Sequence, residues 1–338
     1  MKQYRSLIVP RRGGPEVLQV IENDVRPPAK GEARLRVLAA SVSLPDVEAR
    51  YGRSPFPPKL PFTPGYSVVG EIEALGPNAA SSHKVGERVA ALTVYGGYSE
   101  VVYFPVKRLI PVPPALDPAQ VVPLVLNYIV AYQAMQRVAK VNAGQKALII
   151  GASGGIGTAL LQLGQLTGLK LYGLASQSKH AILQQYGATP IDYKSEDFVQ
   201  AMRRFEPDGL DWVFDGMGGN YLRRGFGLLK RGGQWVSYAN PFSRKNLLQL
   251  LGRLFWHNLP HTGRKLRLYG TGRSYLNMTP FLEDWAALFG LLAEGRIQPV
   301  IAARYPILQA AQANVLLESG QVTGNIVLLN QDRTQSMP

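Results

Sequence analysis

A cluster of glycines between an apolar strand and a helix constrains this chain more than any other stretch. Residues 147–150 form a short apolar run suited to a buried parallel strand, and residues 158–166 have the pattern of a helix. The glycines between them are Gly151, Gly154, Gly155 and Gly157. Such a turn lets the backbone approach a phosphate, to which the helix N-terminus presents free N–H groups. The stretch therefore predicts a nucleotide-binding turn.

Strands and helices alternate after this turn. Strands are expected at residues 169–176, 189–193, 211–215, 234–238 and 265–269. Helical patterns separate some of them, as at 179–186, and a closing helix is expected at 280–294. This order predicts a parallel, doubly wound α/β sheet of the Rossmann type. Ala152 departs from the G-x-G-x-x-G pattern, since it replaces the first glycine.

The first 117 residues have a different pattern. Closely spaced short strands, such as 2–9 and 32–40, are separated by Gly and Pro, which is typical of a barrel-like β domain. Asp117 is suited to cap a helix that begins at residue 119. Residues 297–301 and 324–329 are strand-like again, so this last segment could fold back onto the β domain.

Composition narrows the class of protein. A chain of 338 residues with 46% hydrophobic residues is long enough for two globular domains. It has no cysteine, which excludes disulfides, a thiolate nucleophile and cysteine-ligated metal. We see neither an apolar leader nor a run of about 18 apolar residues that could span a membrane. These features favour a cytoplasmic protein.

Positive charge is concentrated in one region. The net charge is +14, and residues 216–282 contain no Asp or Glu. A basic face there could attract a phosphorylated ligand, an anionic membrane or nucleic acid. The simpler interpretation is a solvated basic surface, and we regard nucleic acid as the least favoured partner.

Several strings resemble the medium-chain dehydrogenase/reductase superfamily. They include residues 39–46 (AASVSLPD), 60–65 (LPFTPG), 70–76 (GEIEALG), 97–102 (GYSEVV) and 324–328 (GNIVL). The match is closest to the zinc-free quinone oxidoreductases, or zeta-crystallin-like enzymes. The resemblance implies a GroES-like β-barrel domain from residues 1–118 and 296–338. It also implies a Rossmann NADPH-binding domain from 119–295, a cleft between them that holds the active site, and a homodimer.

The resemblance also predicts whether the chain binds a zinc ion. The positions that hold catalytic zinc in related alcohol dehydrogenases are Ser43, Tyr66 and Leu126 in this chain, and none is a competent zinc ligand. The cysteine-rich lobe that holds structural zinc is missing after Val89. We therefore expect no metal, which disfavours alcohol oxidation.

The second strand indicates which cofactor binds. Ala175 occupies the position where NAD-binding domains carry Asp or Glu for the ribose 2′-hydroxyl. Ser176 can donate a hydrogen bond to a 2′-phosphate, Lys179 adds positive charge, and Tyr193 matches a family tyrosine near that phosphate. NADPH is therefore the expected cofactor, although Lys179 could also be a solvated lysine.

Other cofactor-binding candidates come from the turn and from the resemblance. The turn contributes Ser153, Gly154, Gly155, Ile156 and Gly157, and the resemblance adds Gly216, Met217, Tyr238, Asn240 and Asn325. Asn325 stands where many relatives have a lysine.

In the family, NADPH gives hydride to a quinone or to an activated alkene, and charge builds on the carbonyl oxygen. Without metal, that oxygen needs a hydrogen-bond donor. The catalytic candidates are Tyr66, Ser43, Tyr51 and Asn127. Tyr66 could instead pack against Phe56 and Phe62, and Asp46 is expected to act as a structural cap.

A second function stays open. Residues 241–271 are basic, and those at 246–256 have helical apolar spacing. This insert could be a lid, part of a dimer interface, or an anchor on an anionic membrane. The alternative function is an NADPH-binding protein with mainly an interaction role at a membrane surface or on nucleic acid.

Overall fold

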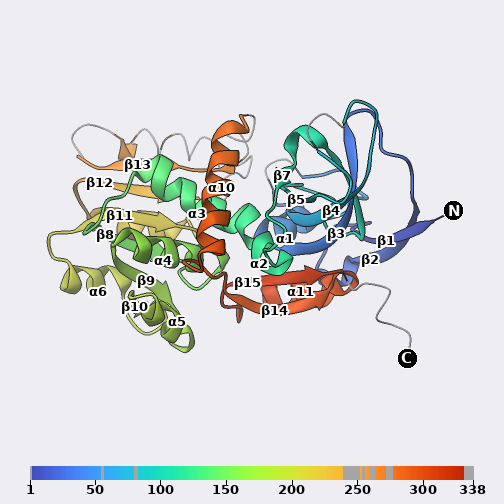
Figure 1. The fold of residues 1–338 in the computed structure, drawn as a ribbon. Coiled ribbons are helices and arrows are strands. Elements are labelled where there is room, and N and C mark those ends of the chain that lie inside the picture. The colour runs from blue at the N-terminus through green and yellow to red at the C-terminus, as the bar shows by residue number, and fades with distance from the viewer. Residues whose placement is uncertain are drawn as a thin grey trace. The chain divides into compact units, whose positions relative to one another are not determined.

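The computed structural model describes residues 2–54, 57–79, 83–238, 252, 256–258, 263–271 and 277–330. Contacts divide the chain into two compact units (Figure 1). Unit 1 consists of Met1–Leu126 and Trp285–Pro338, and unit 2 of Asn127–Asp284. Much of the insert at 241–271, and the cofactor candidate Asn240, lie outside the described residues.

Unit 1 is built around a mostly antiparallel sheet. Its strands are β1 (Gln3–Ile8), β2 (Gln19–Asp24), β3 (Glu32–Val42), β4 (Val68–Leu75), β5 (Arg88–Ala91), β6 (Val101–Pro105), β7 (Ile110–Pro111), β14 (Ile301–Pro306) and β15 (Asn325–Leu329). Among the described residues, β1 and β2 pair separately. The main sheet has the order β14-β15-β3-β4-β5-β7, with β6 paired to β3. The C-terminal strands therefore complete a sheet that the N-terminal segment begins, as the sequence suggested.

The alternation of residues along β3 explains how this sheet forms a core. Ala33, Leu35 and Val37 are fully buried, whereas Arg34 and Arg36 point away and pair with glutamates of β4. Helices α1 (Leu44–Tyr51), α2 (Pro118–Pro123) and α11 (Ala310–Glu318) belong to the same unit. Asp117 caps α2 as predicted, since its carboxylate accepts the Ala119 N–H at 3.0 Å.

Unit 2 contains the predicted parallel sheet. Its strands are β8 (Lys146–Ile150), β9 (Lys170–Ala175), β10 (Thr189–Asp192), β11 (Leu210–Asp215), β12 (Leu229–Ser237) and β13 (Lys265–Leu268). They pair in the order β10-β9-β8-β11-β12-β13, and every pair is parallel. This order reverses between β8 and β11, and nucleotides bind outside the carboxyl ends of the strands at such a switch point.

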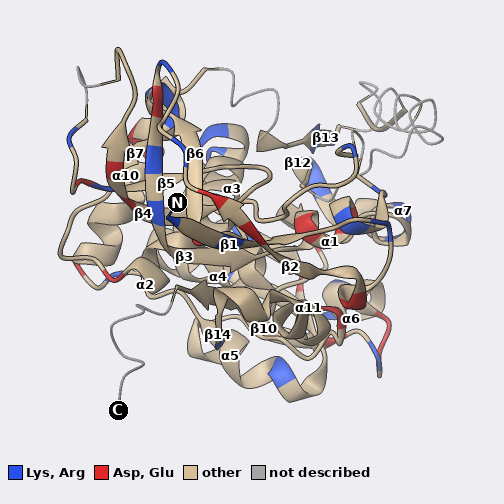
Figure 2. Ribbon diagram, turned by 90° about the vertical axis from the view of Figure 1, so that its right-hand side faces the viewer, with Lys and Arg blue, Asp and Glu red and all other residues tan. Residues whose placement is uncertain are grey.

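Helices connect these strands. The helices of unit 2 are α3 (Ile129–Gln133), α4 (Gly155–Thr167), α5 (His180–Gln185), α6 (Phe198–Phe205) and α7 (Asn220–Gly225). In the sequence, α10 (Thr279–Ala293) contains the residue at which the chain passes from unit 2 to unit 1. Two π-helical segments, η3 (Leu124–Tyr128) and η4 (Ala134–Ala139), flank α3. None of the described helices is long and apolar enough to cross a membrane. The charged residues of α7 and β12 are all basic (Figure 2).

Candidate functional site

The glycine turn in unit 2 lies between β8 and α4. Gly151 has a φ of 83°, which favours glycine, and the Gly154 N–H donates to the Gly151 carbonyl at 3.2 Å. A Cβ atom on Gly157 would lie 2.2 Å from the Gly151 oxygen. No side chain therefore fits at Gly157, where the helix packs directly on the turn.

Gly154 differs from Gly157 because it faces open space. A Cβ atom on Gly154 would have only the Gly151 oxygen within contact range, at 3.6 Å. Gly154 is the N-cap of α4, and the first N–H groups of that helix have no partner within the helix. The turn brings together the predicted residues Ser153, Gly154, Gly155, Ile156 and Gly157. This arrangement fits a diphosphate bound at the start of a 13-residue helix.

Ala152 has a packing role. Its side chain is fully buried, and a Cβ atom on Gly173 of β9 would lie 2.8 Å from the Ala152 Cβ. Ala152 therefore occupies the space that a side chain on the neighbouring strand would need. The departure from the glycine pattern at Ala152 is matched by a glycine at position 173.

Asp215 shapes the loop after β11, a role that the sequence did not suggest. This fully buried carboxylate accepts the N–H groups of Met217 and Gly218, each at 2.8 Å, and the Trp235 Nε1–H at 3.1 Å. Burial raises the pKa of Asp215. The exposed Met217 side chain reaches the glycine turn, since its sulfur lies 3.7 Å from where a Cβ on Gly151 would stand.

Two more predicted residues lie together beside this loop. A Cβ atom on Gly216 would lie 2.7 Å from Cε2 of Tyr238, so the Tyr238 ring covers Gly216 closely. The Tyr238 N–H donates to the Asp215 carbonyl at 3.0 Å. Burial, followed by the Asp215 charge, raises the pKa of the Tyr238 phenol, which is therefore neutral at physiological pH. Gly216, Met217 and Tyr238 thus surround the carboxyl end of β11.

A second group of predicted residues follows β9 and β10. Asp192 and Ala175 pair across these parallel strands, which places Tyr193 and Ser176 at the same edge of the sheet. The Ser176 carbonyl accepts the Lys179 N–H at 2.9 Å, which forms a short 3-10 turn. Burial is the main cause that lowers the pKa of Lys179. β9 ends in the buried Ala175 and contains no acid, so no carboxylate of this strand competes with an anion at this position.

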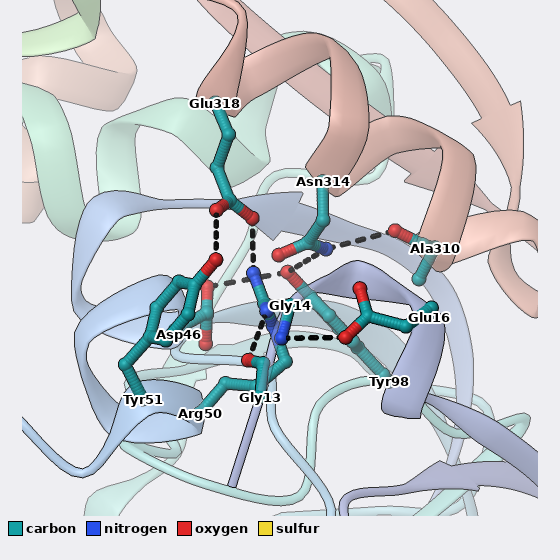
Figure 3. Close-up of polar contacts among 10 residues, drawn as sticks. All are labelled: Gly13, Gly14, Glu16, Asp46, Arg50, Tyr51, Tyr98, Ala310, Asn314 and Glu318. Carbon is teal, nitrogen blue, oxygen red and sulfur yellow. Dashed lines mark hydrogen bonds and ion pairs between the residues drawn. The ribbon is translucent and has the colours of Figure 1, made fainter.

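In unit 1, Ser43 and Asp46 form a buried network at the start of α1. Figure 3 shows Asp46 with two side chains from other elements, Tyr98 and Asn314. Asp46 accepts the Ser43 hydroxyl at 2.6 Å, the Ser43 N–H at 3.0 Å, the Gly65 N–H at 2.8 Å and the Tyr98 hydroxyl at 3.3 Å. Asn314 of α11 donates to the Tyr98 oxygen at 3.5 Å. Burial raises the pKa of Asp46 to about 6, and these hydrogen bonds offset it only in part. Asp46 thus has the capping role expected from the sequence.

Tyr51 belongs to a neighbouring contact in Figure 3. Its hydroxyl donates to Oε2 of Glu318 at 3.0 Å, and the other carboxylate oxygen of Glu318 pairs with Arg50. The Arg50 side chain is 1% exposed, and it also donates to the Gly13 carbonyl at 2.6 Å. The position of Tyr51 therefore depends on a carboxylate from the far end of the chain, which the sequence did not predict.

Three predicted site residues remain, namely Tyr66, Asn127 and Asn325. Tyr66 is half-buried, and its carbonyl accepts the Val94 N–H at 3.1 Å. Asn127 is half-buried in the π-helical segment η3. Asn325 is 3% exposed and donates through its amide to the Val300 carbonyl at 3.0 Å, so this side chain serves the packing of unit 1.

Possible metal ligands do not cluster in the described part of the chain. No three His, Asp or Glu side chains gather there in a way that could hold a metal ion, and the sequence has no cysteine. The three positions that match zinc ligands, Ser43, Tyr66 and Leu126, include one buried hydroxyl committed to Asp46 and one buried aliphatic side chain.

A glycine turn at the switch point of a Rossmann-type sheet, joined to a β unit built from both chain ends, defines a nucleotide-binding dehydrogenase fold. Comparison with known families agrees. Residues 29–114 match the alcohol dehydrogenase GroES-like domain, and residues 186–328 match the family described as zinc-binding dehydrogenase.

Individual relatives show which members of this class of dehydrogenases the chain is similar to. The human synaptic vesicle membrane protein VAT-1 homolog is 31% identical over 339 residues, which cover 96% of this chain and 86% of that protein. The Pongo abelii quinone oxidoreductase is 30% identical over 335 residues, covering 97% and 98%. The Escherichia coli quinone oxidoreductase, solved in complex with NADPH, has the same fold. Its TM-score is 0.86 at 24% identity, with 96% and 99% of the two chains covered. The chain belongs to the medium-chain dehydrogenase/reductase superfamily, in the branch of the quinone oxidoreductases.

Proposed function

We propose that this protein is a zinc-independent, NADPH-dependent oxidoreductase that reduces quinones or α,β-unsaturated carbonyl compounds by hydride transfer. The observation that carries the proposal is the carboxyl edge of the unit 2 sheet. It combines a glycine turn that is open at Gly154 with a second strand that ends in Ala175 instead of an acid. NADPH, when bound, supplies the hydride.

The positions of residues at this edge of the sheet suggest which part of NADPH each would bind. The N–H groups at the start of α4 would hold the diphosphate, and Ser176, Lys179 and Tyr193 would hold the 2′-phosphate. Gly216, Met217 and Tyr238 lie beside the glycine turn, where the ribose and nicotinamide would bind. The relatives support this proposal, since one is a quinone oxidoreductase and the fold is shared with a quinone oxidoreductase that was solved with NADPH.

We assign Tyr66, Ser43, Tyr51 and Asn127 to the substrate. A carbonyl oxygen that gains negative charge needs hydrogen-bond donors when no metal is present. Each of the four carries such a donor: a phenol in Tyr66 and Tyr51, a hydroxyl in Ser43 and an amide in Asn127. In this structure the hydroxyls of Ser43 and Tyr51 donate to carboxylates.

Two glycine variants test whether the turn binds the cofactor. Gly154→Ala should fold normally, because a Cβ atom meets its nearest neighbour at 3.6 Å, but the new methyl group should block a diphosphate. We expect its affinity for NADPH, measured by cofactor fluorescence, to fall at least about 10-fold. Gly227→Ala is the matched control, since nothing lies within 4 Å of its Cβ position. Unchanged NADPH binding by Gly154→Ala would refute the assignment.

Turnover tests the reaction itself. The loss of NADPH absorbance should be followed with a panel of quinones and α,β-unsaturated ketones, and a saturated alcohol with NADP⁺ serves as a separate assay for alcohol oxidation. We expect turnover with at least one quinone or enone. Binding of NADPH with no turnover on any acceptor would favour the alternative function.

The alternative is an NADPH-binding protein that acts mainly by binding a membrane surface. One observation favours it: Trp256 is 64% exposed beside the edge strand β13. Asn258 fixes this segment by hydrogen bonds to both backbone groups of Leu266, each at 3.2 Å, and the neighbours Lys265 and Arg267 are exposed. Six relatives carry the name synaptic vesicle membrane protein VAT-1 homolog or homolog-like. Exposed Trp beside cations is suited to an anionic lipid surface.

Vesicle cosedimentation tests this alternative. Binding to phosphatidylserine vesicles that is lost in high salt, and that Trp256→Ala weakens, would support it. Equal recovery in the supernatant with anionic and neutral vesicles would exclude it.

A further inference from the structure

The turn that follows β10 carries a lysine whose backbone is fixed. Oδ1 of Asp192 accepts the Lys194 N–H at 3.1 Å. The Asp192 carbonyl accepts the N–H groups of Ser195 and Glu196 at 3.2 and 3.1 Å. These short-range bonds hold Lys194 two residues beyond the end of the strand, and its side chain is exposed.

This turn is next to the one that holds Lys179. β9 and β10 are parallel neighbours, and Ala175 pairs with Asp192, so the two turns leave the same edge of the sheet (Figure 1). The Ser176 carbonyl fixes the first turn through the Lys179 N–H at 2.9 Å, as Asp192 fixes the second. Each turn therefore presents one ammonium group at the carboxyl end of its strand.

The charged groups around the two turns are consistent with Lys194 lying near Lys179. Burial, followed by the positive charge of Lys194, lowers the pKa of Lys179, as expected for two ammonium groups on neighbouring turns. The next acids along the chain are engaged elsewhere, since Glu196 pairs with Arg204 at 2.7 Å and Asp197 with Arg224 at 2.6 Å. The hydrogen bond from the Lys194 N–H, and to a smaller extent the charges of His180 and Lys194, lower the pKa of Asp192. Lys194 takes part in no ion pair among the described residues.

We propose that Lys194 is a second cation of the 2′-phosphate site and that it acts together with Lys179 to select NADPH over NADH. The inference rests on the proposed function. A phosphate monoester carries a charge of about −1.5 to −2 at neutral pH, which one lysine does not neutralise. Binding of such a group would relieve the repulsion between the two lysines. Lys194 is thus a specificity-determining residue, and the sequence signal for it is a basic residue directly after Tyr193.

Binding measurements on the full chain test this role without relying on turnover. Dissociation constants for NADPH, NADH and 2′-AMP should be measured for the unmodified protein, Lys194→Ala, Lys194→Arg, Lys179→Ala and the double variant. Lys107→Ala, which removes an exposed lysine from unit 1, controls for the loss of one positive charge. Thermal unfolding of each variant verifies that it is folded.

We expect Lys194→Ala to weaken NADPH and 2′-AMP about 10-fold and to change NADH less than about twofold, because only the phosphate monoester is contacted. Lys194→Arg should keep most of the affinity. The double variant should lose up to about 100-fold, or somewhat less if the two lysines share one phosphate oxygen.

Two results would overturn the inference, and they are distinguishable. If Lys179→Ala weakens NADPH but Lys194→Ala and Lys107→Ala do not, Lys194 has no part in the site and the proposed function stands. If the unmodified protein binds NADPH no better than NADH, the cofactor assignment itself is wrong, and the inference falls with it.

Discussion

Unit 1 and unit 2 each bury a carboxylate that accepts several hydrogen bonds, yet the two pKa values shift in opposite directions. Asp46 in unit 1 meets only uncharged donors, and burial raises its pKa to about 6. Burial would also raise the pKa of Glu206 in unit 2, but Lys146 at 2.5 Å, Lys170 at 2.7 Å and the Tyr172 hydroxyl outweigh it and lower the pKa to about 2.

The difference shows that the number of hydrogen bonds does not decide the charge of a buried acid. Neutral donors replace water only in part, whereas an ammonium group adds an attraction that water does not offer. Glu206 therefore stabilises its unit in the ionised form, and Asp46 is held in place at a cost in free energy.

The largest expected effect is the loss of the Asp46 carboxylate. Asp46→Ala leaves buried donors from Ser43, Gly65 and Tyr98 without an acceptor, so we expect the free energy of unfolding to fall by about 4 kcal/mol. Urea unfolding measures it, and hydrogen exchange in α1 and β4 should rise before that in β8 and β9. The exposed Asp208→Ala is the control, with a change of less than about 0.5 kcal/mol. A similarly small loss in Asp46→Ala would contradict the network.

The next effect concerns the pH dependence of Asp46. Because the pKa is higher in the folded state than its ordinary 3.8, the group favours folding most below about pH 4, and this contribution is lost as pH rises through about 6. Asp46→Asn carries no titrating proton. We therefore expect the stability of the unmodified protein relative to Asp46→Asn to fall by about 3 kcal/mol between about pH 4 and pH 7. A constant difference across this range would show that the pKa is not raised.

Glu206 should show the opposite sign. Its pKa is lower in the folded state than its ordinary 4.5, so its stabilisation is present above about pH 4.5 and is lost as pH falls towards 2. Glu206→Gln should lose about 2 kcal/mol at neutral pH, since the partner lysines are partly exposed to solvent, and less at about pH 3.5. Urea titrations at the two pH values measure this. If Glu206→Gln instead lost more unfolding free energy at about pH 3.5 than at neutral pH, the contrast between Glu206 and Asp46 would be wrong.

The smallest effects belong to the two tyrosines that donate to these carboxylates. Tyr98→Phe and Tyr172→Phe each remove one hydroxyl, at 3.3 Å from Asp46 and 2.5 Å from Glu206, and each should cost about 1 kcal/mol. They sharpen the comparison, because Tyr98→Phe should raise the pKa of Asp46 further and Tyr172→Phe should raise that of Glu206. Carboxyl carbon shifts in NMR titrations report both. If the pKa of each carboxylate were the same before and after substitution, the tyrosine hydroxyls would have no effect on these pKa values.

The sheet of unit 2 was predictable because its signals are local. The apolar strand, the glycines and the alternation of strands with helices lie in consecutive residues, and the strand order then follows from general rules of chain topology. The glycine turn and the adjacent strand ends accordingly hold the predicted residues from Ser153 to Tyr193 in two groups.

The contacts of unit 1 were less accessible, since they join distant parts of the chain. Nothing around Tyr51 indicates that its hydroxyl meets Glu318, 267 residues away. The helix α1 was also missed, because its start depends on Ser43 and Asp46 in a stretch with a proline, and its C-terminal segment packs through Arg50 on the same distant carboxylate. Asp215 was overlooked because two of its three partners are backbone N–H groups, which leave no trace in the sequence, and the third is Trp235 on another strand.

The pairing of β15 with β3 has a consequence for the order in which the chain can fold. β3 emerges from the ribosome almost 300 residues before β15, so one edge of the unit 1 sheet stays without its native partner during nearly all of synthesis. The glycine turn and the sheet around it can form on the nascent chain before that edge is closed. An unpaired strand edge invites pairing with another chain. We therefore expect chaperones that bind nascent chains to matter more for unit 1 than for unit 2.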